Sequence, residues 1–334
     1  MTTQTPYGVA SEKLGAVSMA DVKPESVKWL WHPRIPLGKL TLIDGDPGLG
    51  KSFITAAISS AVSTGRALPG EQSANPARVL LMSAEDGLAD TVRPRLDALG
   101  ADCSMITALS KRVTLDHAGC VEVHNLLEVE KPKVVIIDPL FAYTGAKVDI
   151  HKANETRDVM TRLSRLAEHH ECAILCVRHL TKSGRDKSIY RGIGSIDLTA
   201  ACRSVLLVGA DVNDRSRRAI VQIKNNLAPL ADPIGYSLDE GRFTWTGVSD
   251  LTADQILASE ETAAESFPIE EAVEFLTVLL SSGPTNQKDV KTAAQKAGIS
   301  EKTLYRAKKK LNVHSYRSGF GGDGSWVWSR NARG

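Results

Sequence analysis

A run of eight residues has the types and spacing that bind a phosphate chain. It follows an apolar run, 39–44, that predicts a β-strand, and a helical pattern comes after it. Glycines let backbone N–H groups wrap phosphates at the positive end of a helix, while the lysine reaches the β- and γ-phosphates and the serine ligates Mg²⁺. An ordinary glycine turn is the alternative, although every fixed position of the motif is filled. The sequence therefore predicts a nucleoside triphosphate site, with ATP and Mg²⁺ as cofactors, at Gly45, Asp46, Pro47, Gly48, Leu49, Gly50, Lys51 and Ser52.

A second metal-side residue should end another buried strand. The apolar run 133–138 ends in Asp138, which is therefore predicted to hold Mg²⁺ through water. Capping of a following helix is the alternative role for this carboxylate.

Hydrolysis also needs a carboxylate that orients and activates water. Many P-loop proteins place it directly after the metal-binding aspartate, but here Pro139 occupies that position. The run 77–83 is followed by Glu85 and Asp86. Glu85 is the predicted base, Asp86 is the alternative, and a solvated loop acid is the third interpretation.

Short β-rich runs alternate with helical patterns as far as residue 245. Runs that are apolar throughout predict strands buried on both faces, hence a mainly parallel sheet flanked by helices. Val159, Leu163 and Leu166 keep helical spacing between two of the runs. The predicted fold is α/β, with a core over 31–247 and an amino-terminal arm over 1–30. The predicted strands are 39–44, 77–83, 104–109, 133–138, 172–177, 203–209 and 219–224.

Six segments, in this order, resemble the RecA-like hexameric replicative helicases, especially the RepA type of plasmids and phages. The resemblance covers roughly residues 31–247, and its segments are GDPGLGKS, VLLMSAEDG, VVIIDPL, CVRHLTK, GIGSIDLTAACR and IVQIKNN. It implies a RecA-like P-loop NTPase core, a homo-hexamer, and a catalytic glutamate after the second strand, in agreement with Glu85.

The same resemblance assigns three further roles. It makes His179 a sensor of the γ-phosphate, for which a buried structural histidine is the alternative. Arg203 matches the arginine finger that a neighbouring subunit supplies, and Lys224 matches the region of a second inter-subunit cation. Lys224 is followed by Asn225 and Asn226 instead of the Lys-x-Arg pair of ring helicases, and either cation could form an ordinary salt bridge.

Two loops would face the central channel of such a ring. The first, 143–149, contains Lys147, and the second, 181–192, contains Tyr190 as a stacking surface and counts Arg178 among its neighbouring bases. Mobile basic loops suit the tracking of a single-stranded backbone, although an ordinary solvated loop is the alternative. The second loop contributes Lys182, Arg185, Lys187 and Arg191.

The charge changes sign along the chain. Residues 248–266 contain five acids and no base, whereas 268–334 contain 11 lysines and arginines against six acids. We therefore expect an acidic linker over 248–267 and a winged-helix-like domain over 268–330 that binds DNA or a partner. Its third helix has a basic outer stripe, with Lys302, Arg306 and Lys309 as predicted DNA-binding residues. Trp326 and Trp328 are expected on one face of a following strand, where they either complete the core, which we favour, or stack on a partner.

Composition bounds the remaining expectations. The chain has 334 residues, 42% of them hydrophobic, and it shows neither a signal pattern nor an apolar run long enough for a membrane helix. Five scattered cysteines indicate reduced packing residues in a cytoplasmic protein.

Three functions compete. The first is an ATP-driven DNA helicase on single-stranded DNA, with duplex DNA and a replication initiator or primase as further partners. The second is a non-helicase RecA-like ATPase such as a recombination mediator or loader. The third is a DNA-binding regulator that ATP gates.

Overall fold

The computed structural model describes most of the chain. The described residues are 17–144, 153–179, 196–211, 214–239, 241–256, 272–273, 275–280, 283–296, 299–318 and 325–329. Within them, no helix is both long enough and apolar enough to cross a membrane. All five cysteines fall in these ranges; none is in a disulfide, and four are buried.

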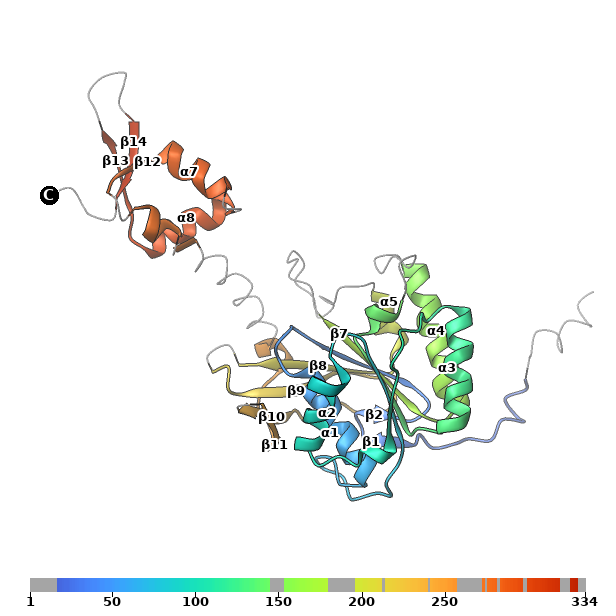
Figure 1. Ribbon diagram of the computed structural model, residues 1–334. Helices are drawn as coiled ribbons and strands as arrows, with labels where there is room; N and C mark the ends of the chain where they lie inside the picture. Colours follow the sequence, from blue (N-terminus) through green and yellow to red (C-terminus); the bar gives the residue numbers. More distant parts are fainter. Residues whose placement is uncertain are drawn as a thin grey trace, which may run out of the picture.

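The centre of the core is a nine-stranded sheet with the order β11-β10-β9-β8-β3-β7-β6-β4-β5. Figure 1 shows this sheet with helices beside it. The strand before the phosphate-binding run, β3, lies between β7 and β8 and is parallel to both. Six strands are mutually parallel, namely β3 Leu40–Gly45, β4 Val79–Ser83, β5 Ile106–Ala108, β6 Val134–Asp138, β7 Ala173–His179 and β8 Ser204–Ala210. The predicted α/β class with a mainly parallel sheet is therefore confirmed.

Helices cover both faces of this sheet. Leu42 and Ile43 are adjacent in β3 and enter different hydrophobic clusters, because successive side chains of a strand point to opposite faces. The first face packs against α3 His117–Glu130, α4 Ala153–His169 and α5 Ile196–Ala201. The second face packs against α1 Lys51–Thr64 and α2 Arg93–Ala98, which continues a π-helical turn, Leu88–Val92.

Three antiparallel strands extend the sheet beyond β8. They are β9 Arg218–Asn225, β10 Ile234–Asp239 and β11 Arg242–Val248. The sequence predicted the first of these strands but not the other two, because β11 is largely exposed and lacks a continuous apolar run. A separate two-stranded pairing joins β1 Trp29–Trp31 to β2 Ile35–Pro36, so the end of the predicted arm is ordered and Trp31 is buried.

The first residues of the predicted acidic linker pack on the core. Leu251 and Ile256 are buried in a small cluster with residues of β8 and β9. Gly209 accommodates this contact, because a Cβ there would lie 1.9 Å from Ile256 Cγ2. Asp250 also pairs with Arg217.

The carboxyl-terminal unit has its own hydrophobic core. Leu276, Val290, Leu304 and Trp328 pack together between the helical segment 275–279, α7 Gln287–Lys296, α8 Glu301–Lys310 and a small antiparallel sheet. Its strands have the order β12-β14-β13, with bounds Thr285–Asn286, Ser325–Ser329 and His314–Ser318. Ser300 caps α8 by accepting the Thr303 N–H.

The two tryptophans of β14 differ. Trp328 is fully buried, as expected of a core residue, but Trp326 is 55% exposed, so the expectation of a shared core role is wrong for Trp326. The helices that cover Trp328 do not cover Trp326.

Candidate nucleotide-binding site

The phosphate-binding run forms the turn between β3 and α1. Gly48 and Gly50 have φ angles of 80° and 93°, which side chains with a Cβ rarely adopt. Gly50 also packs against β10, where a Cβ would lie 2.4 Å from Leu238 Cδ1. Because Gly50 is the N-cap of α1, the first free N–H groups of that helix point to the turn. The local geometry is that of an anion-binding loop.

Lys51 is buried in the turn that it follows. Its ammonium donates to the carbonyl oxygens of Gly45 at 2.6 Å and Asp46 at 2.8 Å, and the residue is only 3% exposed. A buried cation needs oxygen acceptors of this kind. These contacts hold the ammonium inside the loop where a triphosphate would be bound.

The carboxyl ends of the parallel strands meet beside this loop. Ser83 of β4 is the register partner of Asp138 of β6, and Gly45 of β3 is that of His179 of β7. Ser52 and Asp138 line one cavity of about 30 Å³, together with Ser83. A hydroxyl and a carboxylate facing the same space are oxygen ligands of the type that Mg²⁺ prefers. The described residues therefore fit both a triphosphate chain and its Mg²⁺.

The two candidate bases have different surroundings. Asp86 lines the same cavity but pairs with Arg95 at 2.5 Å, and the Arg95 guanidinium lies 4.6 Å from the centre of the Phe53 ring. Glu85 is exposed and lies on the turn after β4. The ion pair with Arg95 therefore uses the Asp86 carboxylate, the less exposed of the two.

A buried ion pair lies directly behind the phosphate-binding loop. Arg178 donates to Asp44 through Nε at 2.7 Å and through Nη2, and both side chains are at most 5% exposed. Burial raises the pKa of Asp44, and the Arg178 charge acts in the opposite direction. Nη2 also contacts Thr199 Oγ1 of α5 at 3.4 Å. The interpretation of Arg178 as a base of the channel loop is therefore wrong, because its guanidinium pairs with Asp44 inside the core. The sequence did hold a signal for this pair, since an acid and a base end two of the predicted apolar strands.

The proposed inter-subunit cations differ in exposure. Arg203 is exposed and directly precedes β8. Lys224 in β9 donates to the carbonyl oxygens of Thr199 at 2.7 Å and Ala200 at 3.1 Å. Burial lowers the pKa of Lys224. These carbonyls belong to the last turn of α5, where a cation is favourable. His179 ends β7, but its side chain lies outside the described residues.

Two of the predicted DNA-binding side chains are described, both on α8. Arg306 and Lys309 are exposed on α8, and Lys302 belongs to the same helix, although its side chain lies outside the described residues. Lys308 of this helix instead lies over the Trp328 ring at 4.4 Å. Outside the described residues are Lys147, Lys182, Arg185, Lys187, Tyr190 and Arg191.

An aromatic contact that the sequence did not reveal supports the loop from the antiparallel extension. The Tyr236 hydroxyl of β10 donates to the Leu49 carbonyl at 2.6 Å. The Tyr236 ring stacks on Phe243, whose ring in turn meets the edge of Trp245, with centroids 5.5 and 4.7 Å apart. Trp245 contacts Trp31 at 5.6 Å. A strand far from the motif in sequence therefore bonds the loop backbone, and the ring contacts hold its tyrosine in place.

Several known proteins are similar to parts of this chain. DNA repair protein RadA of Streptococcus pyogenes is 30% identical over 152 residues, and RadA of Mycobacterium tuberculosis is 28% identical over 153 residues. Each alignment covers 44% of this chain and less than a third of the relative. Among solved structures, a KaiC-like protein of Pyrococcus horikoshii has a TM-score of 0.47 at 11% identity, covering 63% of this chain and 90% of that one. A second solved structure, an isolated ATPase domain, has a TM-score of 0.49 at 14% identity, covering 63% of this chain and 85% of that one.

The family assignment rests on the region that contains the nucleotide site. The AAA domain family matches residues 10–185, which is more than half of the chain and includes the phosphate-binding loop, Glu85 and Asp138. The matched region therefore includes the buried Lys51 and the two predicted Mg²⁺ ligands, Ser52 and Asp138. The chain therefore belongs to the AAA domain family.

Proposed function

We propose that this chain is an ATP-dependent DNA motor, a ring-forming replicative helicase that translocates on single-stranded DNA. The observation that carries the proposal is that most groups of the nucleotide site lie in the core of this chain, whereas one candidate cation lies on its surface. The core supplies the loop, Lys51, Ser52 and Asp138, while Arg203 is exposed and so is available to a neighbouring subunit. A ring, which we take to be a homo-hexamer, would complete each site with the arginine of the next subunit.

The proposed chemistry assigns one role to each group. Lys51 and the loop amides bind the phosphates of ATP, and Ser52 with Asp138 holds Mg²⁺. Glu85 activates the attacking water, since Asp86 is tied to Arg95. His179 senses the γ-phosphate, and Lys224 remains the second inter-subunit cation of the proposal, although one chain alone already gives its ammonium two carbonyl partners.

DNA is the proposed substrate of the motor. The support is the basic face of α8 and the similarity to the bacterial DNA repair protein RadA. We assign the carboxyl-terminal unit to a winged-helix domain whose α8 contacts single-stranded or duplex DNA. The loops with Lys147, Lys182, Arg185, Lys187 and Arg191 would contact the strand in the channel, and a replication initiator or primase would be the protein partner.

The RadA relatives favour a second candidate. A non-helicase RecA-like ATPase would bind DNA or assemble on it in an ATP-dependent manner without separating strands. An ATP-gated DNA-binding regulator is the third candidate, but a carboxylate at position 85 and an exposed Arg203 are not needed by a protein that only binds.

One set of assays separates the candidates. ATP hydrolysis by the full chain is measured with and without single-stranded DNA, together with displacement of a labelled strand from a forked duplex. A helicase should show DNA-stimulated hydrolysis and displacement, both lost in Glu85→Gln. DNA-stimulated hydrolysis without displacement would establish the second candidate, and a folded protein with neither activity would exclude a motor.

A further inference from the structure

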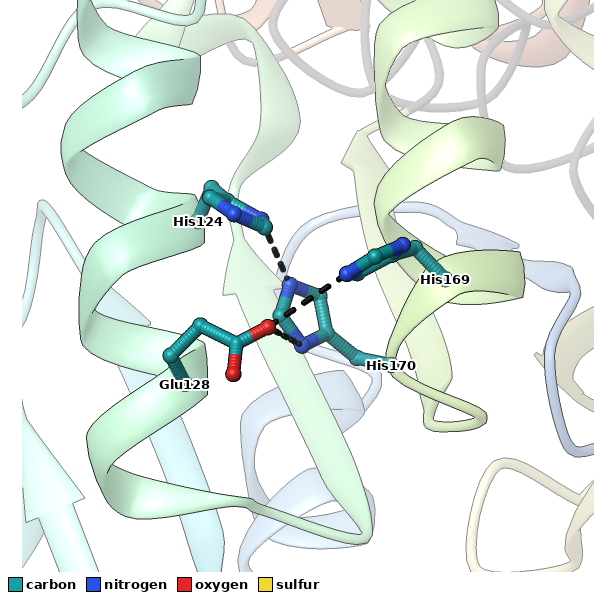
Figure 2. Close-up of side chains that lie close together, drawn as sticks. All are labelled: His124, Glu128, His169 and His170. Atoms are coloured by element: carbon teal, nitrogen blue, oxygen red, sulfur yellow. Dashed lines mark hydrogen bonds and ion pairs between the residues drawn. The ribbon is translucent and has the colours of Figure 1, made fainter.

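A cluster of three histidines and one glutamate lies on the helical face made by α3 and α4. His124 and Glu128 are four residues apart and so share one face of α3, while His169 ends α4 and His170 follows it (Figure 2). One ring nitrogen from each histidine and one Glu128 oxygen all lie within 4.8 Å of one another. Side chains from two segments far apart in sequence therefore point to a common space.

The cluster and the nucleotide site lie at opposite edges of the sheet. α3 leads into the start of β6, and His170 precedes the start of β7 by a few residues, so the cluster is near the amino edge of the strands. The phosphate-binding loop follows the carboxyl end of β3. The two sites share no residue.

The spacings within the cluster suit a coordination shell better than a hydrogen-bond network. Glu128 Oε1 lies 3.3 Å from His169 Nε2 and 3.6 Å from His170 Nδ1, which is long for hydrogen bonds. Ligands about 2.0 Å from one tetrahedral ion lie about 3.3 Å from each other. His124 Nδ1 lies at hydrogen-bond distance, 2.9 Å, from the other ring nitrogen of His170, Nε2; since one imidazole gives only one nitrogen to an ion, this contact must change when a metal binds.

The environment allows the small adjustments that binding would need. The largest separation, 4.8 Å, must shorten by about 1.5 Å to reach the tetrahedral spacing. The Glu128 and His169 side chains are 52% and 62% exposed and can rotate, whereas His170 is only 7% exposed and provides a fixed anchor. Exposure of two ligands also leaves a path for an ion to enter.

We propose that His124, Glu128, His169 and His170 form a binding site for one divalent transition metal of the zinc class, which clamps α3 to α4. Imidazole nitrogens favour zinc, copper and nickel, whereas Mg²⁺ and Ca²⁺ favour oxygen ligands. Three nitrogens and one carboxylate oxygen fill a tetrahedral shell, which is the arrangement of a structural ion. The clamp joins two of the helices that cover this face of the sheet.

Cobalt titration tests the site. The full chain, without a histidine tag and stripped of metal by a chelator, is titrated with Co²⁺ in excess Mg²⁺, which occupies the oxygen ligands of the nucleotide site. We expect one Co²⁺ per chain with the strong visible absorption of tetrahedral cobalt, displaced by Zn²⁺, and no near-ultraviolet band from a thiolate. Weak octahedral absorption, a thiolate band or no uptake would overturn the proposal.

Two ligand variants and a matched control make the assignment specific. His169→Ala and Glu128→Gln change exposed side chains, and each should weaken Co²⁺ and Zn²⁺ binding by about ten-fold or more. His117→Ala removes an exposed histidine of the same α3 and should bind like the wild type. Zn²⁺ should also raise the melting temperature of the wild type but not of His169→Ala. Equal affinities in the ligand variants and the control would place the metal elsewhere.

The nucleotide site provides the last control. Lys51→Ala should retain Zn²⁺ binding, and His169→Ala should retain ATP binding, because the two sites share no residue. Loss of metal binding in Lys51→Ala would mean that the ion occupies the nucleotide site and would overturn the proposal.

Discussion

Cationic side chains in the core and on α8 have opposite surroundings. Around the nucleotide site, Lys51, Arg178 and Lys224 each donate to protein oxygens, and the first two are almost fully buried. On α8, Lys309 faces solvent. A desolvated cation is held in one place by its acceptors, whereas a solvated cation acts through a field that salt screens. The first kind can set the geometry of one site, and the second kind can only add affinity for a polyanion.

The largest effect is expected from the buried lysine of the loop. Lys51→Ala should lower ATP turnover by about 10³-fold or more and weaken nucleotide binding, because the phosphates lose a fixed cation in a site with little water. Lys39→Ala, at the other end of β3, removes a lysine that pairs at the surface with Glu168 and should leave turnover unchanged. Steady-state hydrolysis and nucleotide titration of both variants provide the measurement. Equal loss in the two variants would contradict a specific role for the loop lysine.

Glu85 and Asp86, the two acids that follow β4, allow a similar test with carboxylates in place of cations. Glu85→Gln should lower turnover by about 10²–10⁴-fold while ATP still binds, because the general base is lost and the phosphate contacts remain. Asp86→Asn should instead weaken the contact with Arg95, with a smaller effect on turnover. Single-turnover hydrolysis with a nucleotide-binding assay separates the two steps. If Asp86→Asn has the larger effect on hydrolysis, Asp86 is the base.

The buried ion pair should matter most for stability. Arg178→Met should lower the free energy of unfolding by about 3–5 kcal/mol, because Asp44 would remain buried without its partner. Arg93→Met breaks an exposed pair with Asp97 and should leave the denaturation curve nearly unchanged. Urea unfolding of both variants and of Asp44→Asn/Arg178→Met measures the difference. A double variant no more stable than Arg178→Met would show that the uncompensated charge is not the cause.

The smallest effects belong to the exposed cations of α8. Lys309→Ala should flatten the dependence of log affinity on log salt by about 0.7 for single-stranded DNA or about 0.9 for duplex, as for one lost phosphate contact. Lys308→Met should change the salt slope less and instead destabilise the unit by up to about 1 kcal/mol, because Lys308 lies over Trp328. Fluorescence anisotropy over a salt series gives both slopes. An unchanged slope for Lys309→Ala would mean that this lysine does not contact DNA.

The sequence predicts features that a short stretch of chain determines by itself. The phosphate-binding run is contiguous, and Asp138 ends a continuous apolar strand, so both could be located without tertiary contacts. The seven predicted strands are all present, and all but β5, whose three residues are only half-buried, consist largely of buried residues. Their direction is a different matter, because the pairing of β9 with β8 is antiparallel and nothing in the run 219–224 indicates it.

What the sequence could not give depends on contacts between distant segments. Arg178 looks like a loop base until Asp44 of the neighbouring strand is placed beside it. The histidine cluster needs α3 and α4 to lie side by side, although a histidine and a glutamate four residues apart and a histidine pair were visible separately. Trp326 and Trp328 have equivalent positions in an alternating strand, and only the extent of the covering helices distinguishes them.

The row of aromatic rings behind the phosphate-binding loop gives the protein an internal optical probe. The Leu49 carbonyl accepts a hydrogen bond from the Tyr236 hydroxyl, and two ring contacts, through Phe243, connect Tyr236 to the indole of Trp245. Any rearrangement of the loop on nucleotide binding alters the surroundings of that indole, and with them the wavelength and yield of its emission. Comparison of the wild type with Trp245→Phe isolates this signal from the other tryptophans, so occupancy of the site can be followed in real time without a label.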